Sequence, residues 1–418
     1  MTRVVVTGLG AISPLGNTVD ALWQNVINGK SAAGPITRFD ASRFKTQFAC
    51  EVKNFSPEEW IEKKDLRKYD LFTQYAIAAT EQAIEDAGLD FKKMTAEQRN
   101  EVGVIWASGN GGIGTFEEQL TNFYKGDGTP RFNPYFIPKM IVDIAAGVIS
   151  IRHGLHGPNY CTVSACASSN TALINAFDTI RLGKAMIMIA GGSEAAITPS
   201  SIGGFNASQA LSKRNDSPLQ ASRPFDKDRD GFVIGEGAGA LILEELNHAI
   251  NRGAHVYAEV VGGGMAADAY HLTGTAPDGY GAGLGMSKAL ADAGIRASEV
   301  DYINAHATST YLGDLSELTA IKKIFNDLPV TISATKSMTG HLLGAAGAIE
   351  SIICTLAIKN NLVPPTINTL TLDADAPQQL HILLAQAEKM QVNYALNNTF
   401  GFGGHTATSI FKKFNPPL

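Results

Sequence analysis

The chain has 418 residues, of which 44% are hydrophobic and 18% charged, and this balance excludes a disordered, collagen-like or disulfide-stabilised protein. At roughly 150 residues per unit, the length predicts two or three structural units around a large core. The 34 basic and 40 acidic residues give a net charge of −6, which argues against nucleic-acid binding over the whole surface.

The first predicted element is a strand that begins at Arg3 in the segment RVVVTG. No charged leader with an apolar stretch precedes it, and no uncharged apolar run of about 18 residues occurs later, so neither a signal peptide nor a transmembrane helix is expected. Gly8 and Gly10 suggest a dinucleotide-binding loop, but Ser13 stands where the third glycine of GxGxxG would be. A Rossmann dehydrogenase is therefore disfavoured.

Further apolar runs of strand character alternate with helix-length segments: VGVIWASG, AMIMIAGG, GALILEEL, HVYAEVVGGG and VDYINAHA. Continuous apolar strands suit a sheet that helices cover on both faces, so we expect an α/β fold. The motifs IEDAG and LADAG each close a helix-like segment, and RVVVTGLG has a counterpart in AEVVGGG. This repeat predicts two similar halves, residues 1–255 and 256–418, packed as a pseudo-dimer, with chance similarity between α/β units as the alternative.

The segment TVSACASSN predicts a short strand, a sharp turn and a helix that starts near Cys166. The helix dipole and free N–H groups there would lower the pKa of the thiol, which makes Cys166 a candidate nucleophile. A buried, inert thiol is the alternative. Cys50, Cys161 and Cys354 are expected to pack, and without a C-x-x-C pair the cysteines indicate free thiols in a cytoplasmic protein.

Two histidines lie in polar turns after predicted strands. His306 follows VDYINA, and His341 lies between a strand and a helix in SATKSMTGHLLGAAG. Ligands bind at such strand ends in open α/β sheets, and a neutral imidazole there can donate a hydrogen bond to a developing negative charge. A capping or core role is the alternative for either histidine alone.

Lys336 stands among small residues, so we expect it to be buried and paired with Glu350 or Glu317, with an exposed lysine as the alternative. Asp314 and Glu317 are candidates for groups behind the site or for helix N-terminal carboxylates.

Near the end of the chain, FGFGGHTAT places Gly401, Gly403 and Gly404 around Phe402. Such a backbone can present an N–H group to an oxyanion and move an aromatic gate, whereas a plain tight turn is the alternative. No His, Cys and Asp cluster has metal-ligand spacing, so a zinc enzyme is disfavoured.

Six segments together resemble one family, in its order along the chain: VVVTGLGAISPLGN, TVSACASSN, SRPFDKDRDGFVIGEGAG, NAHATST, TKSMTGHLLGAAGAIES and FGFGGHTAT. They are similar to the motifs of β-ketoacyl-acyl-carrier-protein synthases, most of all those of the type II elongating synthases of bacterial fatty-acid synthesis. The resemblance implies a thiolase-like fold, with two similar α/β halves in a five-layered α-β-α-β-α core, and a homodimer. It also implies decarboxylative Claisen condensation of malonyl-acyl-carrier protein with an acyl group on the enzyme, without a metal or redox cofactor.

The resemblance assigns a role to each candidate residue. Cys166 would be the acyl-accepting nucleophile, His306 and His341 its partners, and Lys336 the active-site lysine. The N–H groups of Cys166 and Phe402 would form the oxyanion hole, with Phe402 also acting as the gate. The substrate-binding residues implied are Thr308, Thr310, Gly401, Gly403 and Asn110, and the groups behind the site are Asp314, Glu317 and Glu350.

On the helix-like segment EKKDLRKYD, Lys64, Arg67 and Lys68 match a basic patch that docks the acidic acyl carrier protein. A solvated helix face is the alternative, because their i, i+3, i+4 spacing permits both.

Three residues depart from the family pattern: Ala307 replaces a glycine, Tyr311 a proline, and Asn110 a residue that is often apolar. The first two are expected to shift the geometry of the carrier arm, and Asn110 leaves the preferred acyl length open.

The alternatives are a synthase I or polyketide ketosynthase, a degradative thiolase, a chain-length-factor-like partner subunit and a Cys-His hydrolase. The thiolase is disfavoured because no second catalytic cysteine is found, and the partner subunit because Cys166 is present.

Overall fold

Eleven strands of the computed structural model, which describes residues 2–416, join in one sheet: β1 (Val4–Ile12), β4 (Val102–Ala107), β5 (Asn159–Thr162), β6 (Ile187–Glu194), β7 (Gly237–Glu245), β8 (Ala258–Ala267), β9 (Tyr302–Asn304), β10 (Thr331–Ser333), β12 (His381–Ile382), β14 (Tyr394–Gly401) and β15 (His405–Lys412). Two short ribbons add β2 (Gly34–Pro35) with β3 (Phe48–Ala49), and β11 (Leu362–Val363) with β13 (Glu388–Lys389). The predicted α/β fold is confirmed, and all of the apolar runs singled out in the sequence are strands.

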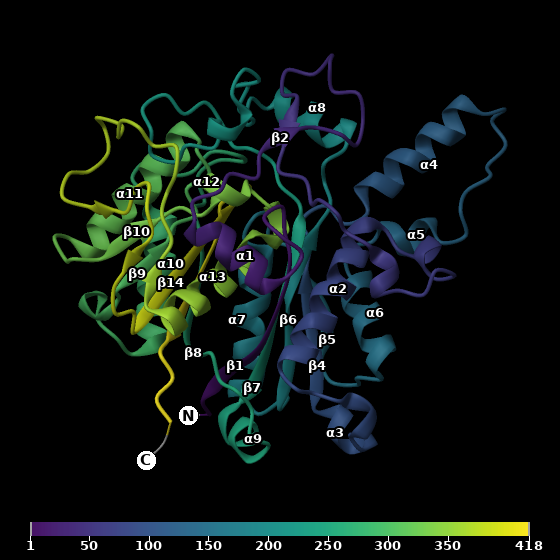
Figure 1. The fold of residues 1–418 in the computed structure, drawn as a ribbon, viewed down its shortest axis with the longest axis horizontal. Helices are drawn as coiled ribbons and strands as arrows, with labels where there is room; N and C mark the ends of the chain where they lie inside the picture. The colour runs from purple at the N-terminus through teal and green to yellow at the C-terminus, as the bar shows by residue number, and fades with distance from the viewer. Residues whose placement is uncertain (1, 417–418) are drawn as a thin grey trace.

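The α-helices are α1 (Val19–Ile27), α2 (Leu71–Asp86), α3 (Ala96–Asn100), α4 (Ile113–Lys125), α5 (Phe136–Met140), α6 (Ile144–His153), α7 (Ser168–Arg181), α8 (Pro199–Ala207), α9 (Leu246–Asn251), α10 (Tyr280–Ala293), α11 (Tyr311–Phe325), α12 (Lys336–Thr339) and α13 (Ala346–Asn360). Figure 1 shows that most of them pack against the sheet, whereas α4 projects from the body.

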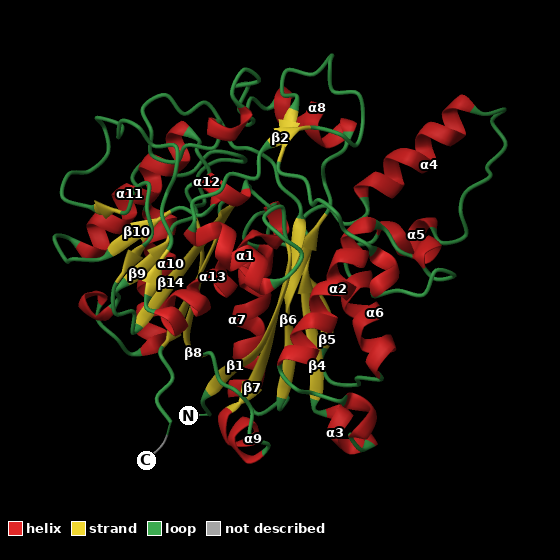
Figure 2. Cartoon of the chain, in the orientation of Figure 1, coloured by secondary structure: helices red, strands yellow, loops and turns green. Residues whose placement is uncertain are grey.

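Each side of the sheet follows the same plan outward from its centre. One side runs β1, β7, β6, β4, β5, and the other runs β8, β15, β14, β9, β10. On both sides the first two pairings are antiparallel and the next two are parallel. The sides join where Val4–Val6 pairs with Ala258–Val260, and Figure 2 shows the two groups of strands that result. The repeat predicted from the sequence is therefore present in the strand order.

The repeated glycines allow one helix in each half to approach its central strand closely. A Cβ on Gly8 of β1 would lie 2.2 Å from the carbonyl oxygen of Ala83 in α2. In the second half, a Cβ on Gly264 of β8 would lie 2.1 Å from the carbonyl oxygen of Gly285 in α10. Larger residues would separate helix from sheet, so both copies of the motif serve the same packing.

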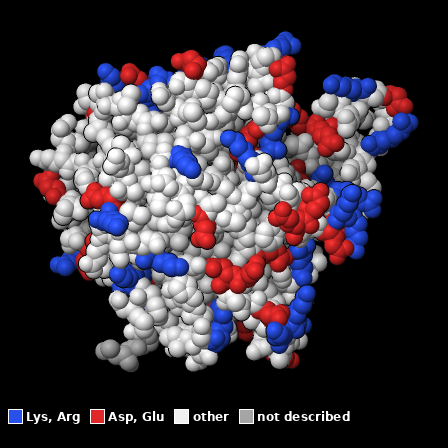
Figure 3. Space-filling model, viewed as in Figure 1, with Lys and Arg blue, Asp and Glu red and all other residues white. Residues whose placement is uncertain are grey.

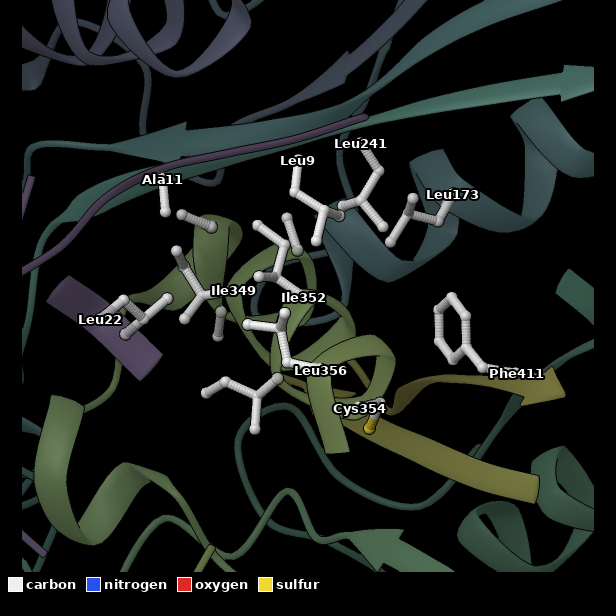
Figure 4. Packing of buried hydrophobic residues seen from close by; sticks show 14 of the residues in the cluster. Leu9, Ala11, Leu22, Leu173, Leu241, Ile349, Ile352, Cys354, Leu356 and Phe411 are labelled. Carbon is white, nitrogen blue, oxygen red and sulfur yellow. The ribbon is translucent and has the colours of Figure 1, made fainter. Parts of the chain in front are cut away.

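Helices α7 and α13 lie between the two groups of strands. Helix α7 contacts β4 and β6 of the first half and β15 of the second, while α13 contacts β7 and β14. Figure 4 shows the core that they build, where Leu173 of α7 and Ile352 of α13 approach Leu9, Leu241 and Phe411. With α2 and α6 on one outer face and α10 and α11 on the other, the helices and strands follow the implied five-layered order.

One helical stretch, Leu343–Asn360, is long and apolar enough to cross a membrane by length and composition, but 89% of it is buried inside the protein. This stretch includes α13. Its faces are mostly apolar because it is buried between the two groups of strands.

Candidate active site

Cys166 follows a strained turn between β5 and α7. Ala165 has a φ of +50°, a left-handed conformation that costs an L-residue on the order of 1 kcal/mol. The Ser168 hydroxyl holds this turn, because it accepts the N–H of Ser164 at 2.9 Å and donates to the carbonyl of Ala165 at 2.6 Å. Cys166 therefore lies at the head of α7, as predicted, with its position fixed by the turn.

The predicted lowering of the thiol pKa is wrong for this structure. Burial raises the pKa of Cys166 to about 12, against the opposing positive charge of Lys336. The negative charge of Glu194 raises it further, while the N–H groups of Phe402 and of Cys166 itself lower it. Loss of water around the sulfur thus outweighs the charge of Lys336 and the two N–H groups. Of the other thiols, Cys50 and Cys354 are buried and Cys161 is partly exposed.

His306 and His341 pack against each other and line the same cavity as this thiol. His306 follows β9, and His341 follows the short helix α12 after β10, so both lie beyond strand ends, as predicted. Their ring centroids are 5.3 Å apart at an interplanar angle of 88°. Burial, reinforced by the positive charge of Lys336, holds the pKa of both imidazoles well below the ordinary range. Both rings are therefore neutral at pH 7 and can donate from one nitrogen.

Lys336 is buried and pairs with Glu350, one of its two predicted partners. Burial raises the pKa of Glu350 to about 7 despite this lysine. Lys336 does not itself line the cavity that holds Cys166, but its charge acts on that thiol and on both histidines. It therefore lies behind the reacting groups.

Two buried carboxylates on α11 fix the turn that carries His306. Glu317 accepts the N–H groups of His306 and Ala307 at 2.9 and 2.7 Å. Asp314 accepts the N–H of Ser309 at 3.1 Å, and burial raises its pKa to about 7 although Arg229 opposes this. Both residues occupy the predicted place behind the site, and Ala307 fits there with its side chain buried.

The glycine-rich segment is a hairpin between β14 and β15, turning at residues 402–404. Gly401 ends β14 so close to the nucleophile turn that a Cβ on it would lie 2.6 Å from the Ser164 carbonyl oxygen and 3.0 Å from the Cys166 nitrogen. This approach brings the Phe402 N–H to the Cys166 sulfur. Gly403 is outside the cavity lining and instead donates its N–H to the Leu272 carbonyl at 2.8 Å.

These groups meet in one cavity of about 510 Å³, here called the site cavity. Of the predicted residues, its lining includes Cys166, His306, His341, Thr308, Thr310, Asn110, Gly401 and Phe402. The hydroxyls of Thr308 and Thr310 are 3.1 Å apart. Tyr311 also lines the cavity and is exposed, with its hydroxyl donating to Asp375 at 3.0 Å. The structure therefore brings these eight predicted residues, from turns far apart in the chain, into the lining of one cavity.

Sequence reasoning missed the aromatic side of the cavity and a buried carboxylate next to it. Phe205 packs edge-on against Phe232 and Phe402, and Phe232 against His341. Nothing in the pattern of the sequence separates these rings from ordinary core residues. Glu194 is fully buried at the end of β6. The sequence feature that could have identified it is an acidic residue at the end of the apolar run AMIMIAGGSE.

The segment with Lys64, Arg67 and Lys68 is not the predicted helix. It forms turns and a single 3₁₀ turn, Leu66–Lys68, so the helical spacing does not apply. Lys64 pairs with Glu62 at 2.7 Å and Lys68 with Asp65 at 2.6 Å, while Arg67 is exposed. In Figure 3, basic side chains gather on the flank that carries α4 and α5, mixed with acidic ones.

No group of three or more His, Cys, Asp or Glu side chains that could hold a metal ion occurs within residues 2–416. The arrangement of a thiol, two neutral imidazoles and two N–H groups is suited to acyl transfer and to stabilising an enolate.

Comparison with known proteins identifies the family. The models for the N-terminal and C-terminal domains of β-ketoacyl synthases match residues 1–249 and 257–370. The chain is 48% identical over 414 residues to a 3-oxoacyl-[acyl-carrier-protein] synthase 2 of Synechocystis sp., covering 99% of this chain and 98% of that one. It is 47% identical over 417 residues to the synthase 2 of Staphylococcus aureus, with the same coverage.

A solved type II polyketide ketosynthase, in complex with its acyl-carrier protein, superposes with a TM-score of 0.88 and 36% identity over 99% of this chain and 100% of that one. The fold is accordingly thiolase-like, as the sequence motifs implied. The chain belongs to the β-ketoacyl synthase family of condensing acyltransferases.

Proposed function

We propose that this protein is a β-ketoacyl-acyl-carrier-protein synthase that elongates fatty acyl chains by two carbons. The observation that carries the proposal is the meeting of Cys166, His306 and His341 in one cavity, with two backbone N–H groups beside the sulfur. The names of the relatives from Synechocystis sp. and Staphylococcus aureus agree with this activity.

In the first half-reaction, the sulfur of Cys166 attacks the thioester carbonyl of an acyl-carrier protein. The N–H groups of Cys166 and Phe402 stabilise the oxyanion, and expulsion of the carrier thiol leaves an acyl-cysteine. Because the resting thiol is protonated at pH 7, its proton must leave during the attack. A neutral histidine can accept this proton and pass it to the sulfur of the departing carrier thiol, which leaves the histidine neutral again.

In the second half-reaction, His306 and His341 donate hydrogen bonds to the thioester oxygen of malonyl-acyl-carrier protein. Loss of carbon dioxide leaves an enolate at this oxygen, and its carbon attacks the acyl group on Cys166. The acyl C–S bond then breaks, and the Cys166 sulfur leaves as a thiolate that takes up a proton from solvent. The product is a 3-oxoacyl thioester, and decarboxylation supplies the carbanion without a metal or redox cofactor. A neutral imidazole suits this role because it donates a hydrogen bond to the enolate oxygen without transferring its proton to it.

Lys336 acts as a positioning residue whose charge sets the electrostatics of the site, since Glu350 holds its ammonium group away from the cavity. Glu317 and Asp314 position the His306 turn. Thr308 and Thr310 contact the phosphopantetheine arm, and Phe402 is the gate over the thiol.

The carrier protein docks through Lys64, Arg67 and Lys68, although two of these charges have acidic neighbours within the segment. We place the protein in the cytoplasm, and the repeat supports dividing the chain into residues 1–255 and 256–418.

We also propose a homodimer formed along β5, the outer strand of the first half. Tyr160 and Val163, in and just after that strand, are 40% and 55% exposed, and an open edge with apolar side chains favours pairing with a second copy.

A polyketide ketosynthase is the second candidate, because a ketosynthase of that class is among the structural neighbours and Asn110 places an amide in the cavity. Turnover of a series of saturated acyl-carrier thioesters separates the two. A fatty-acid synthase elongates them, whereas a polyketide enzyme prefers oxidised acyl groups.

The test of the proposed function is Cys166→Ala, assayed for elongated product with malonyl- and acyl-carrier thioesters. Elongation should fall to background while malonyl decarboxylation persists, because His306 and His341 remain. Substantial elongation by the variant would refute the nucleophile, and free fatty acid from the native protein would indicate a hydrolase.

A further inference from the structure

Glu194 is a buried carboxylate surrounded by hydrogen-bond donors. One of its oxygens accepts the N–H groups of Gly109 at 2.8 Å and Gly344 at 2.9 Å. The other accepts the Asn110 N–H at 3.1 Å and the Ser108 hydroxyl at 3.2 Å. No Lys, Arg or His side chain in the part of the chain that the structure describes forms an ion pair with it. Four hydrogen bonds therefore replace its water shell.

These donors belong to two loops that are distant in the sequence. The first loop, residues 108–110, follows β4. The second, residues 341–345, begins with His341 and ends in the 3₁₀ turn Leu343–Ala345 that leads into α13. Gly109, Asn110 and Leu343 line the site cavity, whereas Glu194 is outside the lining and joins the two loops from behind. The carboxylate thus holds together two parts of one cavity wall.

The fit around this carboxylate is tight. A Cβ on Gly109 would lie 2.8 Å from a Glu194 oxygen, and a Cβ on Gly344 would lie 2.7 Å from it and 2.3 Å from the Gly109 nitrogen. Leu343, next to this contact, has a φ of +48°, which only surrounding contacts can maintain. The wall therefore keeps its shape only while both loops remain attached to Glu194.

We infer that Glu194 is a positioning residue that joins the 108–110 and 341–345 loops into one wall and so sets which acyl chains the site cavity accepts. The inference rests on the proposed function, in which Cys166 carries the acyl group. In this inference the acyl chain on Cys166 extends along the wall, whose Gly109, Asn110 and Leu343 line the same cavity as the sulfur, so a displaced wall affects a longer chain more. Since the second loop begins at His341, a smaller effect on all substrates is also expected.

The carboxylate is required because its partners are donors. A glutamine at this position would replace one of the two oxygens with an N–H₂ group. At the oxygen that accepts from Gly109 and Gly344, this group would face one N–H donor from each loop, and the 341–345 loop would lose its hydrogen bond to residue 194 without a large void being left. Glu194→Gln is therefore the informative substitution, because it changes the hydrogen bonding and keeps the volume.

The experiment measures transfer from octanoyl- and tetradecanoyl-carrier thioesters onto Cys166, by intact mass, in the native protein and in Glu194→Gln. The matched control is Glu244→Gln, which also neutralises a buried carboxylate. Glu244 lies in β7, accepts hydrogen bonds from Thr7 and Arg252, and is outside the lining of the site cavity. In Glu194→Gln we expect kcat/KM to fall about tenfold for tetradecanoyl transfer and about twofold for octanoyl transfer. The control should keep the native ratio.

The inference would be overturned if Glu194→Gln lost the same factor in kcat/KM for both chain lengths, or if it lost none for either. If Glu194→Gln does not fold, Ser108→Ala, which removes a hydroxyl that donates to Glu194 and lies outside the cavity lining, provides the same comparison of chain lengths and the same criterion. If the native protein forms no acyl adduct on Cys166, the proposed function fails. This failure is distinguishable from failure of the inference about Glu194, because it is seen in the native protein and not in the comparison of variants.

Discussion

At the scale of the residue, the reactivity of Cys166 depends on two opposed effects. The head of α7 favours the thiolate, and burial disfavours it more, raising the pKa of the thiol to about 12. The thiolate fraction should then rise about tenfold per pH unit, without a plateau, between about pH 6 and about pH 9. Alkylation by iodoacetamide followed by mass spectrometry measures this, with Cys166→Ala reporting the background from Cys161. A rate that levels off near neutral pH would contradict the account and restore the predicted low pKa.

The buried pair of Lys336 and Glu350 allows stability and activity to be separated. Lys336→Met leaves a buried carboxylate without its partner and should lower the free energy of unfolding by about 3–5 kcal/mol. The double variant Lys336→Met with Glu350→Leu removes both charges and should recover most of that loss. Elongation should stay low in both, because the positive charge behind the histidines is gone. Urea denaturation and product assays report the two quantities, and a double variant with native activity would assign the pair a structural role alone.

At the scale of the element, the hairpin of β14 and β15 must approach the nucleophile turn closely. Gly401→Ala places a Cβ against the Ser164 carbonyl and should move the Phe402 N–H away from the sulfur, lowering kcat for acyl transfer by about tenfold or more. Gly147→Ala in α6 is the control, because its Cβ meets nothing within 4 Å and its activity should be native. Equal kinetics in the two variants would show that this approach does not position the oxyanion hole.

The strands and helices also show which parts of the fold sequence patterns can predict. Apolar runs predicted the central strands, because a strand that is buried on both faces consists almost entirely of apolar residues. The glycines of FGFGGHTAT predict a gate or a tight turn, and the structure has strands at both ends of the segment with a turn only at residues 402–404. Pairing with β8 and β9 outweighs the local glycine content. The spacing of Lys64, Arg67 and Lys68 predicts a helix, but the segment consists of turns. Spacing alone does not distinguish a helix from successive turns.

At the scale of the whole molecule, the repeated strand order explains why the site could be predicted in part. His306 and Cys166 come from opposite halves, and polar turns after strands were enough to select them as candidates. Glu194 and the aromatic wall were missed because their importance depends on which loops the fold brings together, and this is not encoded in local spacing.

The proposed dimer is the prediction that belongs to the molecule as a whole. Sedimentation equilibrium should give twice the 44.3 kDa of one chain. Val163→Arg, beside the open edge of β5, should shift the protein toward monomer because a charge would be buried in the interface. Leu370→Arg, at a residue that is 82% exposed in the second half, is the control and should remain dimeric. A native protein that sediments as a monomer would refute the proposed dimer.

The most direct test of the central claim is the intact mass of the native protein after incubation with a tetradecanoyl-carrier thioester, before and after malonyl-carrier thioester is added. The account predicts one acyl adduct, located on Cys166, which then disappears as a 3-oxo product two carbons longer forms. Absence of an adduct with any acyl donor, or an adduct that malonyl-carrier thioester does not remove, would contradict it.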